Sequence, residues 1–271
     1  MLLNFKHYTT LAILALASTA SSAPVDDLGF APNITVLSVS DLAPYQNHTV
    51  PSLAPLHKRD VYGEESRHPW PSTQYPFSAV QQLDFNGVSC TVTVVGPRHL
   101  STARHCIPKK HRGKRMQYQY HGGTATLIDI LMLEKTQDCD TLKDDFAVLV
   151  LDRPIFEPVG YLGIRPFDCE SQMHSPKFEN AGFPVINNEM QRIHQNEISV
   201  TGCYWCDDQD ALIGTDADAD KGQSGGPLYT VENGVGWQYG VMSHSHSHRG
   251  TVFAGGKHFT ELVAMARDRY P

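Results

Sequence analysis

The chain has 271 residues, with 22 Lys and Arg against 29 Asp and Glu, which gives a formal net charge of −7. A mildly acidic balance of this kind favours a soluble protein and argues against a nucleic-acid or anionic-membrane partner. The length allows a sizeable hydrophobic core.

The first 23 residues have the organisation of a secretory signal peptide. Lys6 precedes a wholly apolar run over residues 11–17, and Ser21-Ser22-Ala23 follows as a small-residue cleavage site. The apolar run is too short to span a membrane, and no later stretch reaches the length of about 18 apolar residues that a span needs. We therefore expect a secreted, extracellular protein without a membrane partner.

Residues 24–59 differ in composition from the rest of the chain and are predicted to be a removable pro-segment. The segment is rich in Pro, Leu and Ser, has no Cys, and carries glycosylation sequons at Asn33 and Asn47. It ends at Lys58-Arg59, a dibasic pair that resembles the site of a kexin-type processing protease. Removal would leave a mature chain of residues 60–271, a length within the range of one β domain. The alternative is an exposed linker whose basic pair has no role.

All six cysteines lie in the predicted mature chain, and behind a signal peptide they imply disulfides rather than free thiols. The residues alone leave many connectivities open. The Cys-x-x-Cys pair could instead be half of a zinc site, but no second such motif occurs in the sequence, so we expect no metal. The six are Cys90, Cys106, Cys139, Cys169, Cys203 and Cys206.

Short strand-like runs recur along the mature chain and are separated by Gly, Pro and Asn, which is typical of an all-β sandwich or barrel. The last segment changes period, because its apolar residues recur at i, i+3, i+4 and i+7, which predicts a helix. The strand-like runs cover residues 77–83, 90–95, 146–151, 197–201 and 235–242. The helical positions are Phe259, Leu262, Val263 and Ala266.

Three segments together predict a nucleophilic serine. In Gly222-Gln223-Ser224-Gly225-Gly226-Pro227, the glycines permit a tight backbone whose N–H groups turn toward the same point as the hydroxyl. A serine needs an adjacent base, and a base histidine needs a carboxylate to hold its tautomer. His105 and Asp145 supply these groups, in the order His, Asp, Ser. Asp144 is the rival acid, but Asp145 directly precedes the apolar run, so Asp144 is expected to be a solvated neighbour.

These segments resemble the chymotrypsin-like (trypsin-like) serine proteases, which share this chain order. The resemblance implies two packed six-stranded β-barrels with a C-terminal α-helix. It implies a triad of His105, Asp145 and Ser224, and an oxyanion hole formed by the N–H groups of Gly222 and Ser224. We therefore expect a monomeric serine endopeptidase that acts on proteins or peptides without a cofactor. The alternative is an inactive homologue that binds proteins, which is disfavoured because every motif position holds the catalytic residue type.

The resemblance also implies one disulfide pairing and points to one branch of the family. It implies a Cys90–Cys106 bridge that closes the loop presenting the histidine, and our guess for the other pairs is Cys139–Cys169 and Cys203–Cys206. The stretch Val61 to Arg67 looks like the start of glutamyl endopeptidases. Gln223 stands where the animal enzymes have an Asp that pairs with their N-terminus. Removal of the pro-segment would therefore unblock the site or free an amine near the pocket.

The specificity pocket stays open at this stage. Asp218 stands where trypsin-like enzymes hold the carboxylate for Arg or Lys, whereas Met242 aligns with the histidine of Glu-specific relatives. A shift of the alignment would put His244 there instead. The pocket would then bind Glu through His244, a basic side chain through Asp218, or neither. The full set of pocket candidates is Asp218, Ala219, Met242, Ser243 and His244.

His244, His246 and His248 alternate with serines. Alternate residues of a strand face one side, so three imidazoles could bind a transition metal there. No carboxylate partner is implied for them, so we favour an exposed polar strand and expect no metal site.

Overall fold

The computed structural model describes residues 33–38, 40–42, 66–85, 87–107, 117–120, 123–134, 143–156, 159–187, 189–205, 210–246 and 250–271. The predicted signal peptide, the Asn47 sequon, Lys58-Arg59, Cys139, Cys206 and His248 lie outside these residues. No helix within the described ranges is long and apolar enough to cross a membrane.

The first sheet has seven strands in the order β1-β7-β8-β5-β4-β3, with β6 paired to β7. Its members are β1 (Asn33–Leu37), β3 (Val80–Phe85), β4 (Val88–Gly96), β5 (His99–Thr102), β6 (Gln117–Tyr120), β7 (Gly123–Leu133) and β8 (Ala147–Leu151). All neighbours are antiparallel except β1 and β7, which run parallel.

The second sheet has nine strands in the order β14-β15-β18-β17-β16-β10-β13-β2, with β9 paired to β17. Its members are β2 (His68–Pro69), β9 (Gly163–Ile164), β10 (Phe178–Gly182), β13 (Ile193–Ile198), β14 (Val200–Trp205), β15 (Asp210–Thr215), β16 (Pro227–Glu232), β17 (Val235–His246) and β18 (Gly250–Gly256). β11 (Val185–Ile186) and β12 (Glu189–Met190) form a separate pair, and α1 (Cys169–Gln172) is one short helix.

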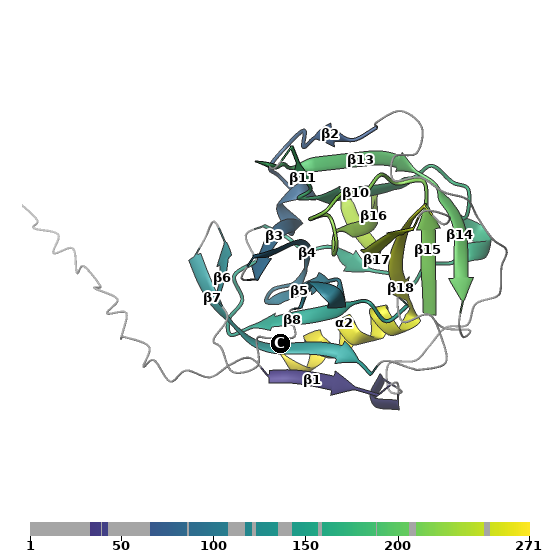
Figure 1. The fold of residues 1–271 in the computed structure, drawn as a ribbon. Helices are drawn as coiled ribbons and strands as arrows, with labels where there is room; N and C mark the ends of the chain where they lie inside the picture. The colour runs from purple at the N-terminus through teal and green to yellow at the C-terminus, as the bar shows by residue number, and fades with distance from the viewer. Residues whose placement is uncertain are drawn as a thin grey trace, which may run out of the picture.

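The fold is all-β, with two packed β-barrels and a C-terminal helix, as predicted (Figure 1). The sheets hold seven and nine strands rather than six each. Without β1 the first sheet has six strands, whereas the second still has seven without the two-residue strands β2 and β9. Two strand predictions were wrong in detail. Residues 77–79 form a 3-10 turn before β3, and residues 197–201 span the break between β13 and β14. At this break Glu197 has a φ of 56° and the N–H of Ser199 donates to the Asp216 carboxylate at 2.8 Å.

The C-terminal helix α2 (Lys257–Arg269) packs against both sheets (Figure 1). All four residues that the helical spacing identified are buried. Phe259 meets Phe146 edge to face, with ring centroids 5.4 Å apart. Because Phe146 directly follows Asp145, this contact holds the start of β8 and thereby one of the predicted site residues.

One predicted disulfide is confirmed and the guess for the others is wrong. Cys90 and Cys106 are bonded, with their Cα atoms 6.2 Å apart. Cys169, at the start of α1, is bonded to Cys203 on β14, with Cα atoms 6.5 Å apart. This bond excludes both guessed pairs.

His99 on β5 is buried, and its Nε2 donates to the carbonyl of Ala266 on α2 at 3.1 Å. Burial, together with the nearby Arg267 guanidinium, lowers the pKa of His99 from 6.5 to about 4. An unfolded chain keeps the higher pKa, so between these two values it binds a proton that the folded chain does not. The free energy of unfolding therefore falls as the pH drops through this window, by on the order of 3 kcal/mol in total.

We expect His99→Gln, which keeps a donor for Ala266 but does not titrate, to lose less stability than the parent protein between pH 7 and pH 4. Urea unfolding at several pH values measures this difference in slope. Equal slopes for the two proteins would show that His99 does not contribute to the acid sensitivity.

Candidate active site

His105 lies in a 3-10 turn, η3 (Arg104–Cys106), that follows β5. The backbone N–H of Cys106 donates to the carbonyl of Ala103 at 3.1 Å, and the disulfide ties the end of the turn to Cys90 on β4. The imidazole is 46% exposed and so remains accessible to a ligand. The two sulfur atoms lie within 4.8 Å of the nearest imidazole nitrogen, but their disulfide leaves no thiolate to bind a metal.

Asp145 lies beside this turn as a buried carboxylate that accepts three hydrogen bonds. Its Oδ1 accepts the backbone N–H of His105 at 2.9 Å, and its Oδ2 lies 2.7 Å from Nδ1 of the same residue. The Ser243 hydroxyl donates to Oδ2 at 2.6 Å. Because an ionised carboxylate can only accept, Nδ1 of His105 carries the proton and Nε2 keeps its lone pair. The structure thus brings together the predicted base and its orienting acid.

Ser243 was predicted only as a pocket residue, and its bond to Asp145 was missed. The two residues are 98 positions apart, and no local pattern links them. The expectation that Asp144 is solvated is also wrong, since Asp144 is buried. The Arg104 guanidinium interacts electrostatically with both carboxylates, which offsets part of the cost of burying their charge. Burial lowers the pKa of Arg104, and Asp144 and Asp145 oppose that shift.

The loop that carries Ser224 is fixed by its carbonyl groups. Thr91 on β4 donates its backbone N–H to the carbonyl of Ser224 at 2.8 Å and its hydroxyl to the carbonyl of Gly222 at 2.9 Å. Gly225 has a φ of 86°, and an added Cβ would lie 2.2 Å from the Thr91 carbonyl oxygen. Only glycine fits at this position.

Two N–H groups of this loop are left for a ligand. The carbonyl of Lys221 accepts from the N–H of Val185 at 2.7 Å, and the carbonyl of Gln223 accepts from the N–H of Gly226 at 2.8 Å. In a trans peptide unit the N–H points opposite to the carbonyl, so the N–H groups of Gly222 and Ser224 point away from these contacts. Within the described ranges, neither N–H has an acceptor.

The serine loop and the histidine turn are in direct contact. The Sγ of Cys106, the residue after His105, lies 3.7 Å from the carbonyl oxygen of Ser224. This is a van der Waals contact, since a disulfide sulfur has no proton to donate. β4 is the element that joins them, because Cys90 holds the turn and the next residue, Thr91, holds the loop.

The trypsin family model matches residues 65–262. This chain belongs to the trypsin family. Within it, the chain is a chymotrypsin-like serine protease relative that is related to glutamyl endopeptidase.

Three curated relatives show how this trypsin-family chain compares. The glutamyl endopeptidase of Bacillus licheniformis is 25% identical over 191 residues, which are 66% of this chain and 57% of that protein. Inactive serine protease 35 of Mus musculus is 35% identical over 77 residues, which are 27% of this chain and 17% of that protein. The Homo sapiens protein is 34% identical over 87 residues, which are 30% of this chain and 20% of that protein. The matches therefore span less than two thirds of the length of each relative.

A solved structure of a Glu endopeptidase in complex with MPD has a TM-score of 0.60 to this trypsin-family chain at 21% identity. The match covers 77% of this chain and 99% of that one. At this identity the likeness establishes the shared fold.

The pocket candidates of this trypsin-family chain lie in different environments. Met242 is buried in an apolar cluster with Tyr239 and Phe253, and Ala219 packs partly exposed against the same cluster. His244 is exposed, after an irregularity in the pairing of β17 with β18. Asp218 is fully buried, and the hydroxyl of Ser66 donates to its carboxylate at 3.3 Å.

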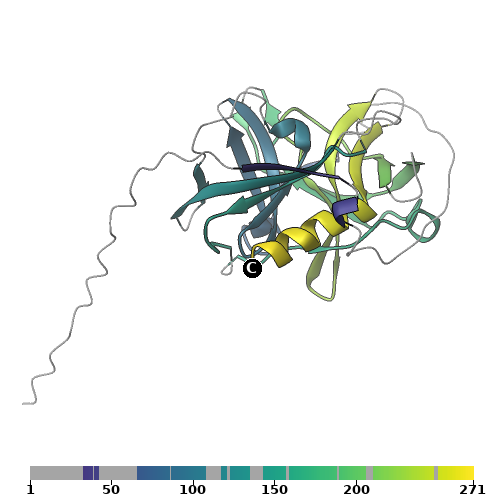
Figure 2. The same ribbon diagram turned by 90° about the horizontal axis from the view of Figure 1, so that it is seen from below.

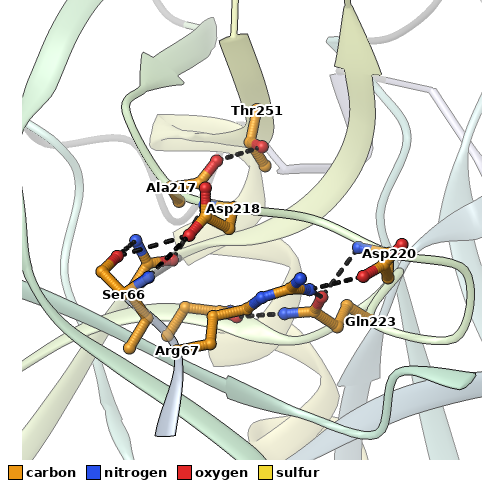
Figure 3. A network of polar contacts seen from close by, with 9 residues as sticks. Ser66, Arg67, Ala217, Asp218, Asp220, Gln223 and Thr251 are labelled. Carbon is orange, nitrogen blue, oxygen red and sulfur yellow. Dashed lines mark hydrogen bonds and ion pairs between the residues drawn. The ribbon is translucent and has the colours of Figure 1, made fainter. Parts of the chain in front are cut away.

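Residues 66 and 67 of this trypsin-family chain bind the segment that leads to Ser224 (Figure 3). The Arg67 side chain is only 4% exposed, and its Nη1 lies 2.9 Å from Oε1 of Gln223 and 2.8 Å from Oδ2 of Asp220. Oε1 of Gln223 also accepts the backbone N–H of Asp220 at 2.8 Å. An internal guanidinium therefore contacts the residue before the serine, where the animal enzymes use their N-terminus. The sequence did not predict this contact of Arg67, which was only the last residue of the stretch that looks like the start of glutamyl endopeptidases.

Proposed function

We propose that this protein is a secreted serine endopeptidase in which His105, Asp145 and Ser224 act as the catalytic triad. The proposal rests on the hydrogen bonds of the Asp145 carboxylate, which accepts from both the backbone N–H and Nδ1 of His105. This pairing leaves Nε2 of His105 as the acceptor for the hydroxyl proton of Ser224. The contact between the histidine turn and the serine loop supports the assignment.

In the proposed reaction, Oγ of Ser224 attacks the carbonyl carbon of the scissile peptide while its proton passes to Nε2 of His105. The N–H groups of Gly222 and Ser224 then bind the oxyanion of the tetrahedral intermediate. His105 returns the proton to the leaving amine, the C–N bond breaks, and an acyl-enzyme remains. A water molecule repeats the sequence, which releases the carboxylic acid and restores Ser224. No cofactor is required.

We further propose that the protein is made as a precursor, with a signal peptide over residues 1–23 and a pro-segment over residues 24–59. A processing protease would cut after Lys58-Arg59. The start of the family match at residue 65, just beyond this site, supports the boundary. The mature enzyme is proposed to act as a monomer on protein or peptide substrates, and the sequons at Asn33 and Asn47 are proposed to be glycosylated.

A second candidate is an inactive homologue that binds proteins. The similarity to inactive serine protease 35 at 34–35% identity favours it, although that similarity covers at most 30% of this chain. The two candidates differ in one property, because only an enzyme activates the hydroxyl of Ser224 toward an electrophile.

The pocket supports a preference for uncharged side chains before the cut. Asp218 is fully buried and already accepts from Ser66, so it is a poor partner for a substrate cation. The apolar Met242 stands where Glu-specific relatives have a histidine, and none of the five pocket candidates is a buried cation. Binding a charged side chain without a partner is costly.

We expect protein processed after Arg59 to cleave a peptide library at apolar or small uncharged residues with a kcat/KM at least about tenfold above that at Glu, Lys or Arg. Met242→His is the matched variant and should raise cleavage after Glu. A profile for the parent protein dominated by Glu or by basic residues would contradict the assigned pocket, and no cleavage at all would contradict the proposed function.

A further inference from the structure

Part of the proposed pro-segment is built into the folded body. β1 pairs in parallel with β7, with Asn33 opposite Asp129 and Leu37 opposite Leu133. The N–H of Glu134 donates to the carbonyl of Leu37 at 2.8 Å and closes the pairing. Figure 1 shows β1 along the edge formed by β7, and Figure 2 shows the same arrangement from below. These residues precede Lys58-Arg59 in the chain.

Two leucines anchor this segment in the core. Leu37 is 8% exposed and Leu42 is fully buried, and both belong to the cluster that contains Phe146 of the first barrel and Phe259 and Leu262 of α2. Between the two leucines, Ser38 and Asp41 are joined in a tight turn. In this turn, the carboxylate of Asp41 accepts the backbone N–H of Ser38 at 2.8 Å and its hydroxyl at 2.9 Å.

A buried carboxylate adds a polar anchor. Asp129 on β7 is 1% exposed, and its two oxygens accept from the Thr35 hydroxyl at 3.0 and 2.9 Å. Oδ2 also accepts from the hydroxyl of Tyr270 at 2.5 Å. Burial, together with this bond to Asp129, raises the pKa of Tyr270 and keeps it a donor. One carboxylate thus links β1, β7 and the C-terminal end of the chain.

From this we infer that residues 33–42 stay bound after cleavage at Arg59, as a non-covalently held strand of the first barrel. The inference rests on the proposed processing of the precursor. The segment would be a lasting part of the enzyme rather than an inhibitor that leaves. Its departure would expose Phe146 and Leu133 and would remove the Thr35 hydroxyl as a donor to the buried carboxylate of Asp129, which is unfavourable.

The contacts of the segment agree with this role. The segment contacts β7 and α2. The hydrogen bonds described for the Asp145 carboxylate come instead from His105 and Ser243, so the segment is not one of these partners. The outward side chains of β1, Ile34 and Val36, are 40% and 49% exposed, so only one face of the strand is anchored. A glycan on Asn33, the first residue of β1, would accordingly remain on the mature enzyme.

The test uses the full chain in a Ser224→Ala background, which prevents self-digestion. Residues 54–59 are replaced by the recognition sequence of a site-specific protease, and the protein is cut to completion. We expect gel filtration in native buffer followed by intact mass measurement to find one fragment containing residues 33–42 per protease domain. The fragment should separate in concentrated guanidinium chloride.

Two substitutions of an apolar residue by aspartate, one at a buried and one at an exposed position of this segment, form a matched pair. Leu42→Asp should lower retention at least about tenfold, because it buries a charge without a partner. Ile34→Asp changes an exposed side chain of β1 and should leave retention unchanged. If Leu42→Asp fails to fold, hydrogen exchange on the cut parent protein decides, with protection of the amides of residues 35 and 37 expected to persist after the cut.

Loss of the fragment from the cut parent protein under native conditions, or exchange of these amides at the rate of a free peptide, would overturn the inference. The readout is independent of catalysis. A Ser224 that does not react with an electrophile would defeat the proposed function without affecting retention, and release of the fragment would defeat the inference without affecting the reactivity of Ser224.

Discussion

Asp145→Asn is expected to reduce kcat on a peptide substrate by about 10⁴-fold while leaving the fold intact. Asn has the same shape and size as Asp, so the burial of the side chain and its packing against the turn are preserved. An amide group facing Nδ1 of His105 can act as a donor, which favours the tautomer with the proton on Nε2. That nitrogen then cannot accept the proton of Ser224.

Ser243→Ala is the matched control, because it removes one of the three donors to Asp145 without changing the tautomer of His105. We expect a loss of about tenfold in kcat, in line with one charge-assisted hydrogen bond. Steady-state kinetics and thermal unfolding of both variants measure the effect. Equal losses in the two variants, or an active Asp145→Asn protein, would contradict the assigned role of Asp145.

Arg67→Ala is expected to lower kcat on the order of 100-fold with a smaller change in KM. The buried guanidinium holds Gln223, which directly precedes Ser224, and Asp220, which lies four positions before it. The two N–H groups without an acceptor among the described residues lie in this same segment. Breaking a buried ionic contact costs about 3–5 kcal/mol. The Asp220 side chain is 45% exposed and can be hydrated, so we expect the free-energy cost here to lie at or below the lower end of that range. The oxyanion contacts act in the transition state, so their loss reduces kcat more than substrate binding.

Arg67→Lys should retain part of the activity, because an ammonium keeps the charge but cannot match the planar fork of the guanidinium. Arg192→Ala removes an exposed arginine and should be neutral. If Arg67→Ala kept its kcat, or if Arg192→Ala lost as much, the arginine would not be what positions the serine loop.

The pairing of His105 with Asp145 was predictable because its signals are local. The residues around His105, Asp145 and Ser224 each form a short motif, and the position of Asp145 just before an apolar run identified the carboxylate that contacts His105. Ser243 and Arg67 were missed as partners because their contacts depend on tertiary proximity, across 98 and 156 positions respectively. The interaction of the buried Asp144 with Arg104 is likewise tertiary, because Arg104 lies in the turn η3.

The fold likewise combines elements that a local sequence pattern predicts with contacts that depend on tertiary structure. The spacing of the apolar residues in the last segment identified α2 correctly, because one apolar face of a helix gives a repeat that is visible in the sequence. The residues with this spacing are Phe259, Leu262, Val263 and Ala266. The Cys169–Cys203 bond was not predictable, since the pairing depends on α1 lying beside β14. β1 was not predicted, because it lies in a segment whose overall composition indicated a removable region. Its role follows from the packing of Leu37 and Leu42 in one cluster with residues that are distant in the sequence, such as Phe146 and Phe259.

In the proposed reaction, His105 and Asp145 activate the hydroxyl of Ser224. The most direct test treats the folded protein with a serine-directed phosphonate and locates the adduct by peptide mass mapping, with Ser224→Ala as the control. We predict one adduct per chain on Ser224, and none in the control. A folded parent protein that stays unlabelled, or an adduct on another residue that persists in Ser224→Ala, would contradict the activation of Ser224.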